Sequence, residues 1–252
     1  MVPSLFSLTG HVAMVTGANT GLGQAIAIAL AEAGADIVAV GRTDPGDTKT
    51  SVLGLGRRFL EVHADLAGTA AIPATVEMAL SEFGQIDILV NNAGIIRRNE
   101  ALEFSEADWD AVLDVNLKSA FFLTQAVGRH MIKAGRGKVI NIASMLSFQG
   151  GIRVASYTAS KSGIAGLTRL LANEWASRGV NVNAIAPGYF ATSNTSTLRA
   201  DENRNRDIVA RIPAGRWGKP AELGGAVVFL AAPASDYVHG AIIPVDGGWL
   251  AR

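Results

Sequence analysis

The sequence predicts an α/β fold in one domain, built on a doubly wound parallel sheet of about seven strands with helices on both faces. Short, almost continuously apolar runs alternate along the chain with longer amphipathic or alanine-rich segments. Such runs are typical of strands that are covered on both faces. No linker, charge block or low-complexity tract interrupts the alternation, so we expect residues 1–252 to form a single domain.

The expected elements follow one another in the order strand, helix, strand. Strands are expected at 11–17, 36–42, 59–66, 86–94, 138–144, 181–188 and 241–248. Helices are expected at 69–83, 105–134, 156–178 and 220–232, and a further alanine-rich helix directly follows the first strand. Because a helix separates successive strands, the strands are expected to run parallel.

A glycine turn joins the first strand to the first helix. The segment TGANTGLG places Gly17, Gly21 and Gly23 between a Val-rich run and a strong helix former. This arrangement places backbone N–H groups and a helix N-terminus against a pyrophosphate, as in a Rossmann-like fold. The spacing is G-x-x-x-G-x-G, and the alternative is a glycine-lined turn without a ligand. We favour dinucleotide binding, because the turn follows a strand and opens a helix.

A tyrosine and a lysine lie four positions apart in the segment YTASK, within a predicted helix. Tyr157 and Lys161 would therefore share one helix face. A cation beside a phenol favours the phenolate and is expected to lower its pKa from about 10. Ser144 would polarise a substrate oxygen, so the three residues can move a proton on or off an alcohol. A Tyr-x-x-x-Lys match alone is weak, because an exposed, solvated pair would look the same.

Composition excludes several other classes of function. Twenty-two basic residues balance twenty-two acidic ones, so no charge field favours nucleic acid or an anionic membrane. The chain has no cysteine, which rules out disulfides and thiolate chemistry. Its four histidines are dispersed without ligand spacing, so no metal site is expected. Neither a secretory signal nor a membrane-spanning run is evident, and we expect a cytoplasmic protein.

From Gly10 to the C-terminus, the chain resembles the short-chain dehydrogenase/reductase family. The motifs that carry the resemblance occur in the family's order: TGANTGLG, Asp65, NNAG at 91–94, Asn116, Ser144, YTASK, and PG at 187–188. The resemblance implies a catalytic group of Asn116, Ser144, Tyr157 and Lys161. The expected cofactor-binding residues are Gly17, Asn19, Thr20, Gly21, Leu22, Gly23, Arg42, Asp65, Leu66, Asn92, Ala93, Gly94, Tyr157, Lys161, Pro187, Gly188 and Thr192.

The same resemblance implies a role for each motif. Asp65 would contact the adenine, and Asn91 with the rest of NNAG would support the adenine ribose side and the central strand. Asn116 would hold a water in a proton relay from Lys161, which would also bind the nicotinamide ribose. The backbone at 187–188 would face the nicotinamide, with Thr192 near its amide or the phosphates. Tyr157 would accept the alcohol proton while the nicotinamide accepts a hydride.

The cofactor is expected to be NAD or NADP, and the end of the second strand bears on the choice. NAD-preferring members carry an acid there that bonds the ribose 2′-OH. This chain has Gly41 followed by Arg42, which removes a repulsion and offers a cation to a 2′-phosphate. The alternative is a solvated arginine at a strand end. We expect NADP to be accepted, with NAD possible.

Several stretches narrow the substrate class by resemblance. ALEFSEADWD, NVNAIAPGYFAT, IPAGRWG and DGGWLAR are similar to sugar-acid dehydrogenases of the family that act at C5 of gluconate or 2-dehydro-3-deoxygluconate. Arg97, with its neighbour Arg98, and Arg153 could meet the carboxylate of such a substrate, and Gln149 its hydroxyls. Arg153 is favoured because it lies between Ser144 and Tyr157. Each arginine would otherwise be a solvated loop residue.

Alternatives remain open for the activity and for one segment. A 3-oxoacyl thioester reductase shares the fold and the catalytic residues, and a dinucleotide sensor would keep the fold without catalysis. Residues 189–216 are polar and follow the cofactor-facing PG, which predicts a substrate lid. An ordered pair of surface helices is the alternative. Family members are usually homotetramers built on the helices of 105–134 and 156–178, so the same assembly is expected here.

Overall fold

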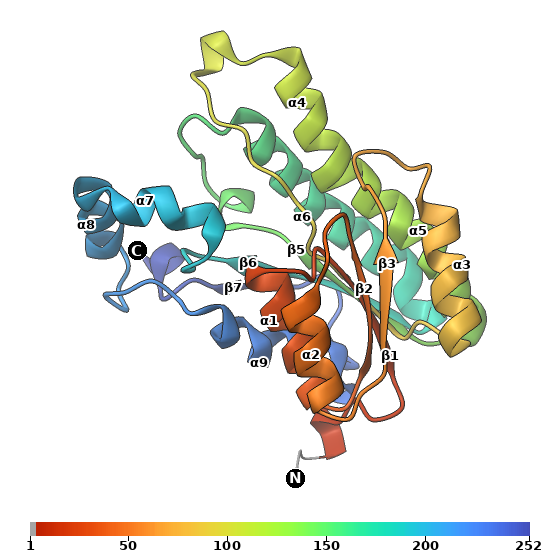
Figure 1. The fold of residues 1–252 in the computed structure, drawn as a ribbon. Helices are drawn as coiled ribbons and strands as arrows, with labels where there is room; N and C mark the ends of the chain where they lie inside the picture. The colour runs from red at the N-terminus through yellow and green to blue at the C-terminus, as the bar shows by residue number, and fades with distance from the viewer. Residues whose placement is uncertain (1–3) are drawn as a thin grey trace.

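The computed structural model, which describes residues 4–252, contains one seven-stranded sheet with the order β3-β2-β1-β4-β5-β6-β7 (Figure 1). The strands are β1 (Val12–Thr16), β2 (Asp36–Gly41), β3 (Phe59–His63), β4 (Ile88–Asn91), β5 (Gly137–Ile142), β6 (Val180–Pro187) and β7 (Ile242–Val245). All six pairings between them are parallel, which confirms the predicted fold class. The strand order reverses between β1 and β4, and ligands bind at such a switch point in open α/β sheets.

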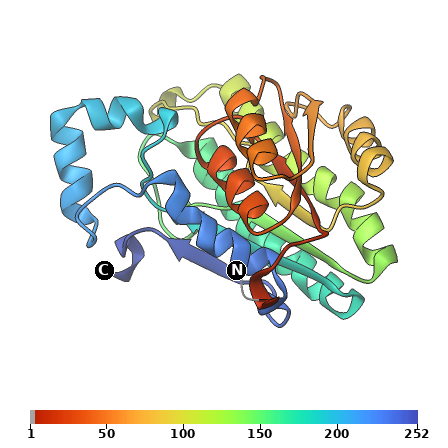
Figure 2. The ribbon, with the colours of Figure 1, turned by 60° about the horizontal axis from the view of Figure 1, so that its bottom comes forward.

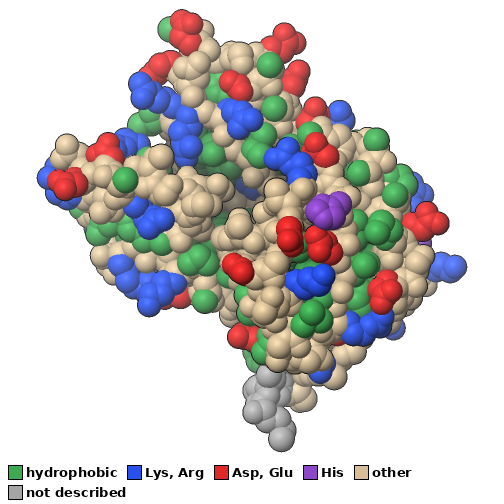
Figure 3. Space-filling model, in the orientation of Figure 1, with side chains coloured by type: hydrophobic (Ala, Val, Ile, Leu, Met, Phe, Trp, Pro, Cys, Tyr) green, Lys and Arg blue, Asp and Glu red, His purple; other side chains and the backbone are tan. Residues whose placement is uncertain are grey.

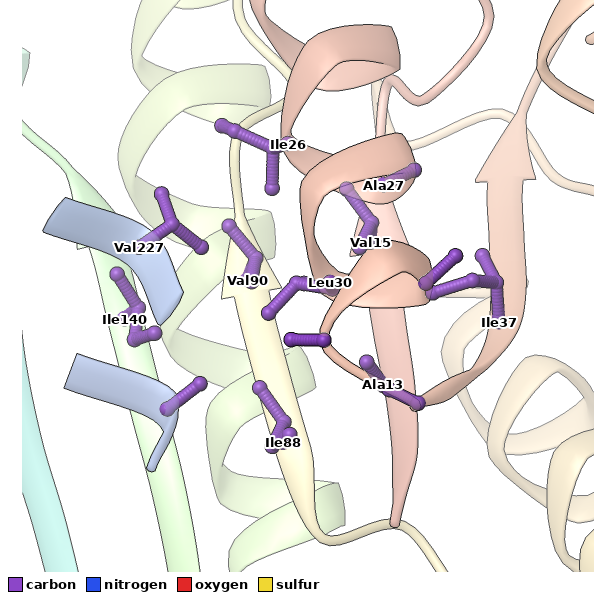
Figure 4. Packing of buried hydrophobic residues seen from close by; sticks show 14 of the residues in the cluster. Ala13, Val15, Ile26, Ala27, Leu30, Ile37, Ile88, Val90, Ile140 and Val227 are labelled. Atoms are coloured by element: carbon purple, nitrogen blue, oxygen red, sulfur yellow. The ribbon is translucent and has the colours of Figure 1, made fainter. Parts of the chain in front are cut away.

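Helices cover both faces of this sheet. They are α1 (Gly21–Glu32), α2 (Gly46–Gly54), α3 (Ile72–Phe83), α4 (Glu106–Leu113), α5 (Ser119–Ala134), α6 (Ala155–Trp175), α7 (Ser196–Ala200), α8 (Glu202–Arg211) and α9 (Gly224–Ala231). On one face, Ile26 and Leu30 of α1 pack with Val227 of α9 over the central strands (Figure 4). On the other face, Leu123 of α5 and Leu171 of α6 belong to a second buried cluster. Because all strands are parallel, their carboxyl ends lie together at one edge of the sheet, between these two layers of helices.

The helix expected at 105–134 is interrupted. A π-helical turn, η3 (Asp114–Lys118), separates α4 from α5 and contains the buried Asn116. The Asn116 amide donates to the carbonyl oxygen of Ile95 (2.9 Å) and accepts from the Ile95 N–H (2.8 Å). Single π turns inside α-helices are frequent at functional sites. The interruption therefore turns Asn116 towards the chain that follows β4.

The segment 189–216 forms an ordered pair of short helices, α7 and α8, that extends to one side of the sheet (Figures 1 and 2). Apolar packing holds it there: Ile208 of α8 and Trp249 near the C-terminus lie in one buried cluster. The indole Nε1 of Trp217 donates to Asn205 Oδ1 of α8 (2.7 Å). The helix pair that was the alternative to a lid is therefore present, whereas a gating motion stays a prediction.

Candidate active site

The glycine turn has a backbone that only glycine accommodates easily. Gly17 and Gly21 have φ angles of +67° and +60°, in the left-handed region that other residues rarely adopt. A Cβ atom on Gly23 would lie 2.0 Å from the carbonyl oxygen of Gly17. Thr20 precedes α1 without a side-chain capping hydrogen bond. The N–H groups of the first turn of α1 therefore lack a capping side chain and remain available to an anion.

The end of β4 holds this turn in place. The Asn92 amide donates to the carbonyl oxygens of Thr16 (2.9 Å) and Gly17 (3.2 Å). In return, Thr16 Oγ1 accepts from the N–H groups of Asn92 and Ala93. Thr16 was not among the predicted site residues, although a hydroxyl residue directly before the first glycine was a usable signal. A Cβ on Gly21 would lie 3.6 Å from Thr192 Cγ2, so the segment after β6 also reaches the turn.

The remaining predicted cofactor residues lie at the same edge of the sheet. Asp65 is exposed after β3 and accepts from the Ala67 N–H (2.9 Å), next to the buried Leu66. Pro187 ends β6, and a Cβ on Gly188 would lie 2.6 Å from Asp246 Cα. The other predicted positions, which flank the glycine turn or follow β4, are Leu22, half-buried, and Gly94, exposed. The fold thus collects residues from four strand ends around the switch point.

The space beside the end of β2, at Gly41, is open. A Cβ on Gly41 would meet nothing within 4 Å, and Arg42 is exposed directly after it. The Asn19 amide of the glycine turn donates to Thr43 Oγ1 (2.6 Å). A small cavity lies between the turn and the strand end, lined by Asn19, Gly41 and Thr43 among others. Residues of the glycine turn and of the end of β2 therefore border the region where an adenosine ribose binds in this fold.

Ser144, Tyr157 and Lys161 come together beyond β5. Ser144 caps the short helix η4 (Met145–Ser147), where its Oγ accepts from the Leu146 N–H (3.2 Å). Tyr157 lies in the first turn of α6, and Lys161 follows one turn later. The buried Lys161 Nζ donates to the carbonyl oxygen of Ile142 (2.6 Å) and lies 5.6 Å from the centroid of the Tyr157 ring. The predicted proximity of these side chains is thus present.

The electrostatics differ from the expectation. Burial raises the pKa of the Tyr157 phenol, while a hydrogen bond with the Ser144 side chain and the charge of Arg98 act in the opposite direction. Burial also lowers the pKa of Lys161, to about 8. The prediction that Lys161 lowers the phenol pKa is therefore wrong in this structure. Burial outweighs the nearby charges, and Lys161 faces the ring and a carbonyl group.

Asn116 connects three parts of the site. Besides its two bonds to Ile95, its amide donates to Ser160 Oγ (3.2 Å), which itself donates to the carbonyl oxygen of Tyr157 (2.8 Å). A Cβ on Gly94 would lie 3.2 Å from Asn116 Oδ1. The loop after β4 therefore depends on Asn116 for its position against α6.

The arginines proposed for the substrate have different surroundings. Arg97 pairs with Asp108 (3.1 Å) and Arg153 pairs with Glu100, both at exposed positions. Within residues 4–252, Arg98 forms no ion pair. Burial raises the pKa of both Tyr157 and Tyr189, and the charge of Arg98 partly opposes this rise.

The charge of Arg98 thus acts on the Tyr157 phenol, whereas the favoured Arg153 is engaged by Glu100. Gln149 is half-buried in the loop between Ser144 and Tyr157. Lys and Arg side chains border the hollow between the helix pair and the rest of the domain (Figure 3).

Comparison with known proteins identifies the family. A family model described as enoyl-(acyl carrier protein) reductase matches residues 17–250. The 2-dehydro-3-deoxy-D-gluconate 5-dehydrogenase of Escherichia coli (strain K12) is 63% identical over 253 residues, covering 100% of both chains. The chain belongs to the short-chain dehydrogenase/reductase family.

Two other members extend this comparison. A crystal structure of a gluconate 5-dehydrogenase from Burkholderia cenocepacia J2315, in complex with NADP and tartrate, is 40% identical with a TM-score of 0.94. The similarity covers 99% of this chain and 98% of that one. A 3-oxoacyl-[acyl-carrier-protein] reductase from Vibrio cholerae is 41% identical over 242 residues, covering 96% of this chain and 98% of that protein.

The residues of this short-chain dehydrogenase/reductase fit a nicotinamide dinucleotide. A pyrophosphate fits against the left-handed glycines and the uncapped start of α1. A ribose fits in the open space beside Gly41. Among the described residues, 4–252, no helix is long and apolar enough to cross a bilayer. The same part of the chain holds no group of three acidic or histidine side chains suited to a metal ion.

Proposed function

We propose that the protein oxidises and reduces C5 of a sugar acid, gluconate or 2-dehydro-3-deoxy-D-gluconate, and accepts NADP as its cofactor. The observation that carries the proposal is the Ser144, Tyr157 and Lys161 centre beyond β5. Arg98, which forms no ion pair within residues 4–252, accompanies it, and its charge partly opposes the burial that raises the Tyr157 pKa. The 63% identity to an E. coli 2-dehydro-3-deoxy-D-gluconate 5-dehydrogenase over the whole chain supports it. So do the NADP and tartrate of the Burkholderia structure.

The catalytic residues divide the work of proton transfer. Ser144 and Tyr157 hydrogen-bond the reacting oxygen where charge develops, and Tyr157 takes its proton during oxidation and returns it during reduction. Bound NADP supplies the hydride acceptor and donor at its nicotinamide ring. Lys161 holds the ribose side of the site, and Asn116 orders a water that links Lys161 to solvent. Because Lys161 has a pKa near 8, it can pass a proton at working pH.

A sugar acid presents its carboxylate at the end of the chain away from C5. Arg98 is exposed in the segment that follows β4, and a guanidinium can meet a carboxylate with paired hydrogen bonds. Glu100 and Asp108 hold Arg153 and Arg97 in exposed ion pairs. We therefore assign the carboxylate to Arg98, with Gln149 available to the hydroxyls.

We further propose that the helix pair of 189–216 acts as a lid. Its start touches the glycine turn through Thr192, so cofactor binding can be transmitted to it. Hydrogen exchange of this segment tests the idea. Added NADP should slow exchange at 189–216, and equal rates with and without NADP would contradict a lid.

Assembly and location also remain proposals. Phe122 on α5 and Leu170 on α6 are large, exposed apolar side chains on the two helices that family members use for assembly. A homotetramer would cover them. A cytoplasmic location accords with a substrate and a dinucleotide cofactor that are both drawn from metabolism.

The test of the proposed function is a panel of initial rates. Hexonates, including gluconate and 2-dehydro-3-deoxy-D-gluconate, are assayed with NADP and with NAD, and 3-oxoacyl thioesters with the reduced cofactors. The proposal expects turnover of a hexonate with NADP. Activity confined to acyl thioesters would instead assign the protein to the reductases represented by the Vibrio relative.

A further inference from the structure

Strand β3, which pairs with β2, contributes an acidic residue to the small cavity beside Gly41. Glu61 of β3 lines this cavity together with Asn19, Gly41 and Thr43. It reaches the cavity because β3 pairs with β2 in parallel, with Ala39 opposite Glu61 and Gly41 opposite His63. No other acid lines this cavity. A carboxylate therefore lines the same cavity as Gly41, which supplies none itself.

Two basic side chains accompany this carboxylate. His63 Nε2 lies 2.8 Å from Glu61 Oε1, and Lys49 Nζ of α2 lies 4.0 Å from Glu61 Oε2. The Glu61 side chain is 22% exposed, whereas those of His63 and Lys49 are 64% and 50% exposed. The acid is thus the more enclosed partner. Both of its carboxylate oxygens have a basic partner, His63 at Oε1 and Lys49 at Oε2.

This arrangement matters for the choice between two dinucleotides. A carboxylate beside the ribose accepts a hydrogen bond from a 2′-OH and repels a 2′-phosphate. Arg42 stands exposed at the end of β2 to attract the same phosphate. The preference for NADP then depends on how far the charge of Glu61 is compensated.

We propose that Glu61 is a specificity-determining residue for the dinucleotide, and that His63 and Lys49 engage its carboxylate so that a 2′-phosphate is tolerated beside Arg42. The inference rests on the proposed use of NADP and is independent of the sugar-acid substrate. Glu61 favours NAD when it is left without its partners and permits NADP when it is paired with them.

The test is the binding of NADPH and NADH, measured by fluorescence titration without substrate. Glu61→Gln should tighten NADPH about fivefold and leave NADH unchanged or weaker, as expected for loss of one partly exposed charge. The double variant His63→Ala/Lys49→Ala should weaken NADPH by about the same factor. Adding Glu61→Gln to this double variant should restore NADPH binding, because the uncompensated acid is then gone.

Matched variants separate the possible outcomes. Asp44→Asn removes a nearby exposed acid that does not line the cavity, and its Kd ratio for NADH over NADPH should stay close to that of the wild type. An equal gain from Asp44→Asn would overturn the role of Glu61, as would an unchanged ratio in Glu61→Gln and in the double variant. Failure of the wild type to bind either dinucleotide would contradict the proposed function itself. Thermal melting checks that each variant is folded.

Discussion

The amine of Lys161 lies over the ring of Tyr157, one helical turn away, with Nζ 5.6 Å from the ring centroid. The same amine donates a 2.6 Å hydrogen bond to the carbonyl oxygen of Ile142 at the end of β5. A buried cation stacked on an aromatic face gains from the ring quadrupole and loses its hydration. Lys161 therefore ties α6 to the end of β5. Burial lowers its pKa to about 8, so its charge changes in the pH range near 8.

Replacement of the phenol tests proton transfer. Tyr157→Phe keeps the ring under Lys161 and removes the hydroxyl, so we expect turnover to fall about a thousandfold. NADPH binding, measured by fluorescence, should stay within about threefold, since the loss is about one hydrogen bond at most. Tyr237→Phe, at a fully exposed tyrosine, is the control and should be silent. Unchanged turnover in Tyr157→Phe would show that Tyr157 is not the acid/base, whereas a wild type that binds NADPH without any turnover would be a dinucleotide sensor.

The role of Arg98 can be separated from that of its neighbour. Arg98→Ala should raise KM for the sugar acid about tenfold or more, because a charge-assisted hydrogen bond to the carboxylate is lost. In the oxidation direction it should also move the acidic limb of the kcat pH profile upward, because Tyr157 must be deprotonated there and the charge of Arg98 opposes the rise of its pKa. Arg97→Ala is the matched control, because Arg97 is already paired with Asp108. Equal effects of the two variants would remove Arg98 from the substrate site.

The buried amine of Lys161 predicts how stability depends on pH. Its pKa falls from 10.5 to about 8 on folding, so between these values the unfolded chain holds more protons. Stability should therefore rise with pH across this window, by up to about 3 kcal/mol for this group. Denaturant unfolding of the cofactor-free protein, compared with Lys161→Met at pH 7 and pH 10.5, measures the effect. A difference between the two proteins that does not change with pH would contradict the assignment.

The glycine turn offers a pair of matched substitutions. Gly23→Ala would place a Cβ 2.0 Å from the carbonyl oxygen of Gly17, so the turn must move and NADPH binding should fall at least tenfold. Gly225→Ala in α9 meets nothing within 4 Å and should leave binding unchanged while stabilising the protein by about 0.5 kcal/mol. Titration and thermal melting report the two effects. Normal binding in Gly23→Ala would show that the turn does not carry the pyrophosphate.

Much of the fold was predictable because its signals are local. Each strand is a nearly continuous apolar run, and burial on both faces demands that pattern whatever the neighbours are. The helix α2 was missed, since its sequence, GDTKTSVLG, has few apolar residues and no clear periodicity. The interruption at Asn116 was also invisible, because the π turn satisfies the backbone of Ile95, which is 21 residues away.

The chain sequence alone determined the doubly wound topology and the glycine turn, because these follow from periodicity and from residue types at short spacing. The reacting side chains stay a prediction that the sequence makes through its family resemblance. Only the tertiary structure decided which of the candidate arginines form ion pairs. Folding brings Asp108 to Arg97 and Glu100 to Arg153 and leaves Arg98 outside these pairs. It also decided the direction of the Tyr157 pKa. Burial is a property of the packed molecule. At Tyr157 the cost of burying the charged phenolate outweighs the stabilisation that Ser144 and Arg98 give it.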